Sequence, residues 1–223
     1  MRRLVLPRLY VILDSSLLKQ SETECAAKLM AAGVRLLQYR NKEAGARELL
    51  EKSRAIAQLV RPQGALFFVN DRPDVAHLAG ADGVHVGQHD LGADAARMVV
   101  GKDKLVGLST HSLQQFSAAA AGSADYIAVG PIFETRTKSD PEPIVGMELV
   151  RQARAMTEKP IVAIGGITLE RASDVIAAGA DSVAVISDIL LAQDSAERAA
   201  KYISILEKAP LVRNQNDADV WLS

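Results

Sequence analysis

The chain has 223 residues, of which 48% are hydrophobic and 24% charged, and its formal net charge is -1. This length and composition indicate one soluble domain with enough apolar residues for a sizeable core, and the length allows a single α/β barrel. A charge balance so close to neutral gives no general attraction to nucleic acid or to a membrane surface. We therefore expect neither as a partner, and a bound anion must be held by locally placed Lys, Arg and backbone N–H groups.

The amino terminus and the cysteine content indicate a cytoplasmic protein. Cys25 is the sole cysteine, which excludes an intramolecular disulfide, and its helical surroundings predict a small buried side chain. The apolar stretch after Met1-Arg2-Arg3 is interrupted by Arg8 and Asp14, and no small-residue cleavage pattern follows it. It therefore indicates a first strand rather than a signal peptide.

Short apolar runs alternate with amphipathic stretches along the chain. The runs, which predict buried parallel strands, cover residues 9–13, 34–37, 65–69, 84–86, 105–108, 126–133, 161–164 and a segment that starts at 182. Helices are predicted at 22–32, 46–60, 147–156 and 196–206. Eight strands that alternate with helices favour a closed (β/α)8 barrel, the TIM-barrel fold, over an open sheet.

A repeated junction supports the barrel. Small residues and a glycine end a predicted helix before a strand at Gly33, Gly80, Gly122 and Gly179, and we expect each glycine to be left-handed. We place a single catalytic domain at residues 1–208. The polar stretch at 209–223 has no periodicity and is expected to be a flexible tail without a role in function.

Polar side chains follow the second strand at alternate positions. Gln38, Arg40 and Lys42 share one face there and can converge on the barrel mouth. Two cations and an amide on one face suit a diphosphate attached to a polar ring. A solvated strand end explains the same spacing equally well.

Two carboxylates follow the next two strands. Asp71 comes after the third strand and Asp90 after the fourth, so adjacent strands bring both within reach of one ion. Mg²⁺ takes one or two protein carboxylates and completes its coordination with water and substrate phosphates. The alternative is that each carboxylate caps a turn or a helix, and for Asp71 considered alone this alternative is favoured.

A second anion site is predicted on the other side of the mouth. Gly165-Gly166 follow the seventh strand and Ser187 follows the eighth. The loops after these two strands of a TIM barrel commonly bind a phosphate monoester through backbone N–H groups. The placement favours a phosphate site over a tight turn alone, and two anion sites with a metal pair imply an enzyme that uses two phosphorylated substrates.

Five longer motifs occur in a fixed order along the chain. They are Gln38-Tyr39-Arg40-Asn41-Lys42, Asn70-Asp71-Arg72, the run from Gly80 to Asp90, Gly107-Leu108-Ser109-Thr110-His111 and the run from Val129 to Lys138. Together with Gly165-Gly166 and Ile186-Ser187, they resemble the thiamine-phosphate synthase family over most of the chain. Tyr39 departs from the family pattern, and we expect it to point away from the mouth and to alter packing rather than chemistry.

The resemblance implies a role for each matching residue. The aminopyrimidine diphosphate would be held by Gln38, Arg40, Lys42, Asn70, Ser109 and Lys138. The thiazole phosphate would be held by Thr135, Thr137, Gly166, Ile186 and Ser187, with Arg136 as a further substrate-binding residue. Mg²⁺ would be bound by Asp71 and Asp90. Of these residues, Arg40, Lys42, Ser109 and Lys138 are expected to act in catalysis.

The implied reaction joins two small molecules. It condenses 4-amino-2-methyl-5-(diphosphooxymethyl)pyrimidine with thiazole phosphate, or its carboxylated form, to give thiamine monophosphate and pyrophosphate. Such a reaction needs neutralisation of a leaving diphosphate and alignment of a nucleophile more than it needs a strong base. We accordingly expect His85, on a barrel strand, to be a hydrogen-bonded interior residue rather than a proton carrier.

Two other functions stay open at this point. A related thiazole tautomerase shares the fold, but we expect it to lack the complete pyrimidine-diphosphate set. A non-catalytic barrel that senses a phosphorylated precursor is the second alternative, and fold alone does not exclude it. The pair Asp71 and Asp90 argues against a sensor. Assembly into a homo-oligomer is compatible with the sequence.

Overall fold

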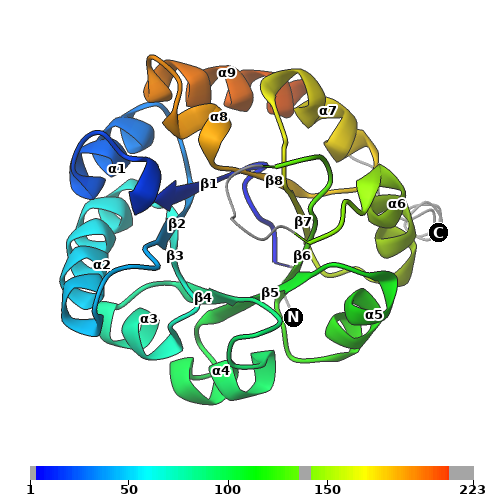
Figure 1. The fold of residues 1–223 in the computed structure, drawn as a ribbon, viewed down its shortest axis with the longest axis horizontal. Helices are drawn as coiled ribbons and strands as arrows, with labels where there is room; N and C mark the ends of the chain where they lie inside the picture. The colour runs from blue at the N-terminus through cyan, green and yellow to red at the C-terminus, as the bar shows by residue number, and fades with distance from the viewer. Residues whose placement is uncertain (1–3, 136–141, 211–223) are drawn as a thin grey trace, which may run out of the picture.

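The computed structural model describes residues 4–135 and 142–210. In this part of the chain eight parallel strands pair in sequence order, and the last pairs with the first to close the barrel. Helices surround the barrel on its outside (Figure 1). The predicted (β/α)8 barrel is therefore confirmed.

The strands are short and lie where the apolar runs predicted them, with small shifts at their ends. In chain order they are β1 (Leu9–Asp14), β2 (Leu36–Arg40), β3 (Leu66–Asn70), β4 (Gly83–Val86), β5 (Leu105–Thr110), β6 (Tyr126–Val129), β7 (Ile161–Ile164) and β8 (Ser182–Val185).

The helices follow the strands one by one, and β8 is followed by a short additional helix, α8. In chain order they are α1 (Glu22–Ala31), α2 (Ala46–Val60), α3 (Pro73–Ala79), α4 (Ala93–Val100), α5 (Leu113–Ala121), α6 (Gly146–Met156), α7 (Leu169–Ala177), α8 (Ser187–Leu190) and α9 (Ser195–Lys208). The four helices predicted from periodicity are α1, α2, α6 and α9, and all four are confirmed.

Alternation along each strand divides the core into two parts. On β1 and β2, Val11 and Leu37 point outward and pack under the helices, whereas Tyr10 and Leu36 point into the barrel. The interior is filled by side chains, as in other barrels of this size. Tyr39 belongs to the outer part, which confirms its expected direction, and Cys25 is buried on α1 as predicted.

Two local predictions were wrong. The apolar run at 126–133 does not form one long strand: β6 ends at Val129, because Pro131 has no N–H to donate to the ladder. The chain then stays beside β7 through a 2.9 Å hydrogen bond from Ile132 N to Ile164 O. Gly122 has φ -87° rather than a left-handed φ, and its N–H closes a tight turn onto Ala119 O.

Some predictions fall outside the described residues. Arg136, Thr137 and Lys138 lie there, as does most of the predicted tail, so that the boundary at residue 208 stays a prediction.

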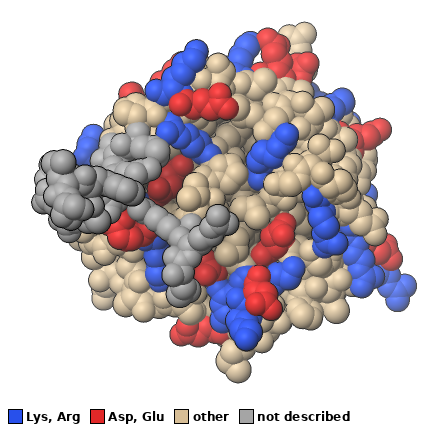
Figure 2. Space-filling view, turned by 180° about the vertical axis from the view of Figure 1, so that it is seen from behind, with Lys and Arg blue, Asp and Glu red and all other residues tan. Residues whose placement is uncertain are grey.

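Across residues 4–135 and 142–210, every helix is too short or too polar to cross a membrane. Figure 2 shows the face opposite that of Figure 1, and on it acidic and basic side chains are interspersed.

Candidate active site

The predicted pyrimidine-diphosphate residues come from neighbouring strands. On β2, Gln38 and Arg40 are on the same face as Leu36, which points into the barrel. Asn70 ends β3 in register with His85 of β4, and Ser109 lies near the end of β5. Since all strands are parallel, these side chains gather at one end of the barrel, and this end is the mouth.

Arg40 is held at the mouth by a buried carboxylate. Asp14, the last residue of β1, is 1% exposed and forms an ion pair with the Arg40 guanidinium. The other carboxylate oxygen of Asp14 accepts hydrogen bonds from Ser16 N at 3.1 Å and Ser16 Oγ at 2.7 Å. Asp14 is thus fully engaged, and it fixes the direction of the Arg40 guanidinium in the mouth.

Lys42 forms the next ion pair along the mouth. Its ammonium group contacts the Asp71 carboxylate. Asp71 has φ +62°, a left-handed conformation that aspartate tolerates better than most side chains do. The Asp71 N–H donates to His85 O at 2.7 Å, which secures this turn onto β4. Asp71 does not cap α3, whose N-cap is Arg72, so the helix-cap interpretation of Asp71 was wrong, whereas Asp71 does lie in a turn.

Asp90 lies beside Asp71. Burial raises the pKa of the Asp90 carboxyl, and the neighbouring Asp71 carboxylate raises it further. Asp90 also accepts a 2.8 Å hydrogen bond from Gly87 N, which closes a turn. The turn interpretation is therefore correct for Asp90, and it coexists with the pairing. Two carboxylates close enough to repel each other are a donor set that suits Mg²⁺.

The metal prediction involves two residues rather than a larger cluster. Among the residues that the structure describes, no group of three or more His, Cys, Asp or Glu side chains is placed to hold a metal ion. Asp71 and Asp90 alone would leave most of an octahedral coordination sphere to water and to a substrate diphosphate.

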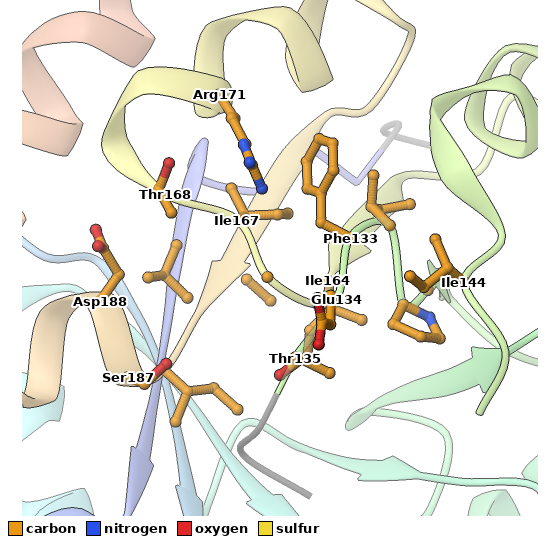
Figure 3. A pocket seen from close by; sticks show the side chains of 18 of the residues that line it. Phe133, Glu134, Thr135, Ile144, Ile164, Ile167, Thr168, Arg171, Ser187 and Asp188 are labelled. Carbon is orange, nitrogen blue, oxygen red and sulfur yellow. The ribbon is translucent and has the colours of Figure 1, made fainter. Parts of the chain in front are cut away.

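A cavity of about 750 Å³ opens on the other side of the mouth, between the ends of β5 and β8. It is lined by the loop after β6, by the loop after β7 and by α8. Figure 3 shows Ser187 and Asp188 of α8 facing Phe133 and Ile144 across it. This volume is typical of a site for a small organic ligand.

The loop after β7 approaches the loop after β6 very closely. Gly166 has φ +61°, and a Cβ at this position would lie 2.2 Å from Glu134 O. Only glycine fits such a contact in this conformation. Gly165 and Gly166 also line the cavity, and two residues without side chains leave the backbone accessible there, which is what a backbone phosphate site needs.

Arg171 adds to this cavity a cation that was not predicted from the sequence. Its guanidinium stacks over the Phe133 ring, with 4.6 Å between Cζ and the ring centroid, and both residues line the cavity (Figure 3). No motif marked Arg171, because it lies on the first turn of α7 among ordinary helix residues. The structure brings it to the mouth through the tight turn that contains Gly166.

The structure places the predicted residues in two groups within one mouth. One group, on β2 to β5 and the turns after them, contains Gln38, Arg40, Lys42, Asn70, Asp71, Asp90 and Ser109. The other group lines the cavity and contains Thr135, Gly166, Ile186 and Ser187. Ser109 also lines the cavity, so it lies at the boundary between the two groups.

Comparison with known proteins decides the family. A sequence model described as thiamine monophosphate synthase matches residues 9–189. The chain belongs to this family. A thiamine-phosphate synthase of Koribacter versatilis is 48% identical over 208 residues, which are 91% of this chain and 97% of the relative. A thiamine-phosphate synthase of Moorella thermoacetica is 43% identical, over 90% of this chain and 96% of the relative.

A solved structure from the same family has the same fold. Thiamine phosphate pyrophosphorylase from Pyrococcus furiosus superposes with a TM-score of 0.83 at 34% identity, over 91% of this chain and 96% of that chain. Membership of this family makes the chain an enzyme of thiamine biosynthesis, and the structure brings the described residues that the resemblance implied together in one mouth.

Two further residues of the mouth, Asp14 and His111, were not predicted from the sequence. Asp14 was interpreted only as an interruption of an apolar stretch, although it follows an apolar run in the same way as Asp71 does. His111 lines the cavity and its Nδ1 lies 2.6 Å from Gly130 O. A rule that any polar residue at the end of a strand belongs to the mouth would have selected both.

Proposed function

We propose that this chain is a thiamine-phosphate synthase that joins 4-amino-2-methyl-5-(diphosphooxymethyl)pyrimidine to thiazole phosphate, or to its carboxylated form, and releases pyrophosphate. One observation carries the proposal: a chain of this family has, in one mouth, a cationic and acidic group on β2 to β5 and a separate glycine-lined cavity at β6 to β8. The two regions match two differently phosphorylated substrates.

The pyrimidine diphosphate binds at the first group. Arg40 and Lys42 neutralise diphosphate charge, and Asp14 keeps the Arg40 guanidinium in place. Asp71 and Asp90 are the residues that would hold Mg²⁺, which when bound supplies further charge neutralisation to the leaving diphosphate. Lys42 then exchanges the Asp71 carboxylate for a phosphate oxygen. Gln38, Asn70 and Ser109 contact the pyrimidine ring at the bottom of the mouth.

The thiazole phosphate binds in the cavity. The backbone at Gly166, together with Ile186 and Ser187, receives the phosphate, and Thr135 contacts it from the loop after β6. Arg136, Thr137 and Lys138 follow Thr135 in sequence, and we assign Arg136 and Thr137 to this substrate and Lys138 to the diphosphate. Anchoring the phosphate far from the reacting nitrogen orients that nitrogen toward the pyrimidine.

With thiazole phosphate the reaction breaks one bond and forms one bond, and the carboxylated form in addition loses its carboxylate as CO2. The C–O bond between the pyrimidine methylene and the diphosphate breaks, and its electron pair leaves with pyrophosphate. The thiazole nitrogen then gives its lone pair to the methylene carbon. Arg40, Lys42 and Lys138 contribute by binding charge, and Ser109 helps to fix the two reactants in line. No side chain has to remove a proton from the nucleophile.

The proposal also covers the setting in which the enzyme works. Its substrates are small molecules, and we place the reaction in the cytoplasm. Residues 1–208 form the catalytic barrel and the following segment is dispensable for the reaction. Assembly into a homo-oligomer is compatible with an active site built, as proposed, from one chain.

The test is direct. Purified protein is mixed with the pyrimidine diphosphate, thiazole phosphate and Mg²⁺, and thiamine monophosphate and pyrophosphate are measured separately. We expect the two products in equal amounts. If a folded preparation forms neither product, the transferase proposal is wrong, and conversion of the carboxylated thiazole between its tautomers would then be assayed as the activity of a related isomerase.

A further inference from the structure

A continuous line of hydrogen bonds crosses the barrel interior below the mouth. Gln38 Nε2 donates to Tyr10 Oη at 2.8 Å, and Tyr10 Oη lies 3.1 Å from Tyr126 Oη. Tyr126 Oη lies 2.9 Å from His85 Nδ1, and His85 Nε2 lies 2.8 Å from Ser109 Oγ. We call these five residues the interior network. Its two ends, Gln38 and Ser109, are the side chains assigned above to the pyrimidine ring.

The tyrosines of the interior network each hold one proton. Burial raises the pKa of Tyr10 and raises that of Tyr126 well above its usual value. Both hydroxyls are therefore protonated, and each can donate one hydrogen bond. Among the described residues, the hydrogen-bond partners of the Tyr10 hydroxyl are Gln38 and Tyr126.

Because each hydroxyl has one proton to donate, the hydrogen bonds of the interior network all run in one direction, from Gln38 to Ser109. Because Gln38 donates to Tyr10, the Tyr10 proton goes to Tyr126, since a buried hydroxyl proton without an acceptor is costly. The Tyr126 proton then goes to His85 Nδ1. An Nδ1 that accepts this proton carries none of its own, so the His85 proton is on Nε2 and is donated to Ser109 Oγ. The Ser109 hydroxyl proton is left to point into the mouth.

We propose that Tyr10, Tyr126 and His85 are positioning residues that fix a hydrogen-bond acceptor at Gln38 Oε1 and a donor at Ser109 Oγ, and thereby select an aminopyrimidine over an oxopyrimidine. The inference rests on the proposed function, which brings the pyrimidine ring to these two side chains. It adds a reason why the ring must carry an amino group.

The chemistry of the two rings explains the selection. An aminopyrimidine offers N–H donors on its amino group and a lone pair on a ring nitrogen. An oxopyrimidine offers an acceptor at the oxygen and a donor at the ring N–H, which is the opposite pattern. To accept it, Gln38 would have to turn its amide, His85 would have to change tautomer, and both tyrosines would have to reverse together. Sites built to match a hydrogen-bond pattern reject mismatched ligands strongly.

Packing holds the interior network in place. The Tyr126 ring is stacked on His85, with 5.6 Å between centroids and 26° between planes. Its edge meets Phe68 at 5.5 Å and 90°. Gly107, opposite Tyr126 in the register of β5 and β6, leaves room for this ring. The hydroxyl therefore has a fixed position between its two partners.

The first experiment measures the tautomer of His85 in the intact protein by ¹⁵N-detected NMR of histidine side chains, without any ligand. We expect neutral His85 to carry its proton on Nε2. The Tyr126→Phe variant should shift His85 toward the Nδ1–H form or a mixture, because Nδ1 no longer accepts a proton from a hydroxyl. Tyr39→Phe, which removes a buried hydroxyl on the outer side of β2, should leave the His85 signals unchanged.

The second experiment compares the 4-amino pyrimidine diphosphate with its 4-oxo analogue as substrates. We expect the ratio of their kcat/KM values to fall about tenfold in Tyr126→Phe and in Tyr10→Phe, the effect of about one hydrogen bond. The ratio should be unchanged in Tyr39→Phe, and the KM for thiazole phosphate should be unchanged in all three variants.

The outcomes separate the two proposals. A His85 that carries its proton on Nδ1 in the unmodified protein overturns the inference, even if the enzyme is active. Discrimination that is unchanged in both interior tyrosine variants overturns it as well. If the unmodified protein forms no thiamine monophosphate, the proposed function fails, whereas the tautomer still reports whether the interior network has the stated direction.

Discussion

The Tyr126 ring fills the space inside the barrel that a side chain at Gly107 would need. A Cβ at Gly107 would lie 2.1 Å from Cζ of Tyr126 and 2.4 Å from its hydroxyl oxygen. The ring is fully buried, so it cannot move aside into solvent. The tyrosine on β6 therefore requires a residue without a side chain at this position of β5, although the two residues lie 19 positions apart in sequence.

Gly107→Ala tests this relationship. We expect a loss of about 1 to 3 kcal/mol in the free energy of unfolding, the usual range when a packed core receives an extra group. Urea denaturation gives the value. Gly45→Ala is the control, because nothing lies within 4 Å of a Cβ there; it is an N-cap position, and we expect a change below about 1 kcal/mol. Equal losses in the two variants would contradict the packing argument.

The metal prediction concerns Asp71 and Asp90. Asp71→Asn and Asp90→Asn should each raise the Mg²⁺ concentration needed for half-maximal turnover and lower the maximal rate, because a ligand charge is removed. The double variant should lose less than the sum of the two single losses, since both act on one ion. Mg²⁺ titrations of the rate measure this. Lower melting temperatures with an unchanged Mg²⁺ requirement would show instead that the residues only stabilise turns.

The sequence was sufficient for the barrel and for the polar residues at the ends of β2 to β4, but not for Asp14, His111 and Arg171. Apolar runs and helical periodicity depend on burial, which acts locally on each strand and helix. The end of β6 and the conformation of Gly122 were not predicted, because both depend on contacts with the surrounding chain. A run of apolar residues, or a glycine after alanines, carries no information about such contacts.

The interior network could not be predicted from the sequence, for a physical reason. His85 and Tyr126 are 41 residues apart, and Tyr10 and Tyr126 are 116 residues apart. Each residue alone fits an interior position, as was predicted for His85. Their connection depends on the barrel closing between β1 and β8 and on the space at Gly107. Asp14 differs, because its position after an apolar run was visible and was given too little weight.

Gly166→Ala separates backbone strain from steric contact in the phosphate loop. The added methyl group would meet Glu134 O and would disturb the loops after β6 and β7. We expect the KM for thiazole phosphate to rise about tenfold or more, as when one or two charge-assisted hydrogen bonds are lost, with little change for the pyrimidine diphosphate. Steady-state kinetics with each substrate varied gives both values.

Gly64→Ala is the matched control for this variant. Gly64 has φ +66°, close to the +61° of Gly166, but nothing lies within 4 Å of its Cβ. Gly64→Ala should lose about 1 to 2 kcal/mol of stability from the left-handed backbone. Gly166→Ala should lose at least this much, because it adds the contact with Glu134 O, and only Gly166→Ala should lose affinity for thiazole phosphate. Equal kinetic effects would remove Gly166 from the proposed phosphate site.

Asp14→Asn tests the support of Arg40. The change keeps the shape of the side chain but leaves a largely buried guanidinium without its counter-charge, which typically destabilises a protein by about 3 to 5 kcal/mol. We also expect a higher KM for the pyrimidine diphosphate, because Arg40 is no longer held in the mouth, and an unchanged KM for thiazole phosphate. Urea denaturation and the two KM values are measured together. Normal binding of both substrates by a destabilised variant would confine Asp14 to a structural role.

Glu22 gives a prediction for the pH dependence of stability. Burial acts to raise the pKa of this carboxyl, but a hydrogen bond from its own backbone, Lys52 and Ser15 outweigh burial and hold the pKa below its usual value. Lys52 Nζ lies 3.0 Å from the carboxylate. A carboxyl whose pKa is lower in the folded protein stabilises the fold above its unfolded pKa of about 4.3, and this contribution is lost as pH falls through the folded pKa.

Glu22→Gln should therefore lower stability at pH 7 by about 0.5 to 1 kcal/mol, the range of a partly exposed ion pair. The difference from the unmodified protein should shrink as pH falls from about 5 to 3, because both proteins then carry a neutral side chain at this position. Urea denaturation across this pH range measures it. In a Lys52→Met background the effect of Glu22→Gln at pH 7 should be smaller, since the main cation is already absent. A difference that stays constant down to pH 3 would show that Glu22 acts through packing and not through its charge.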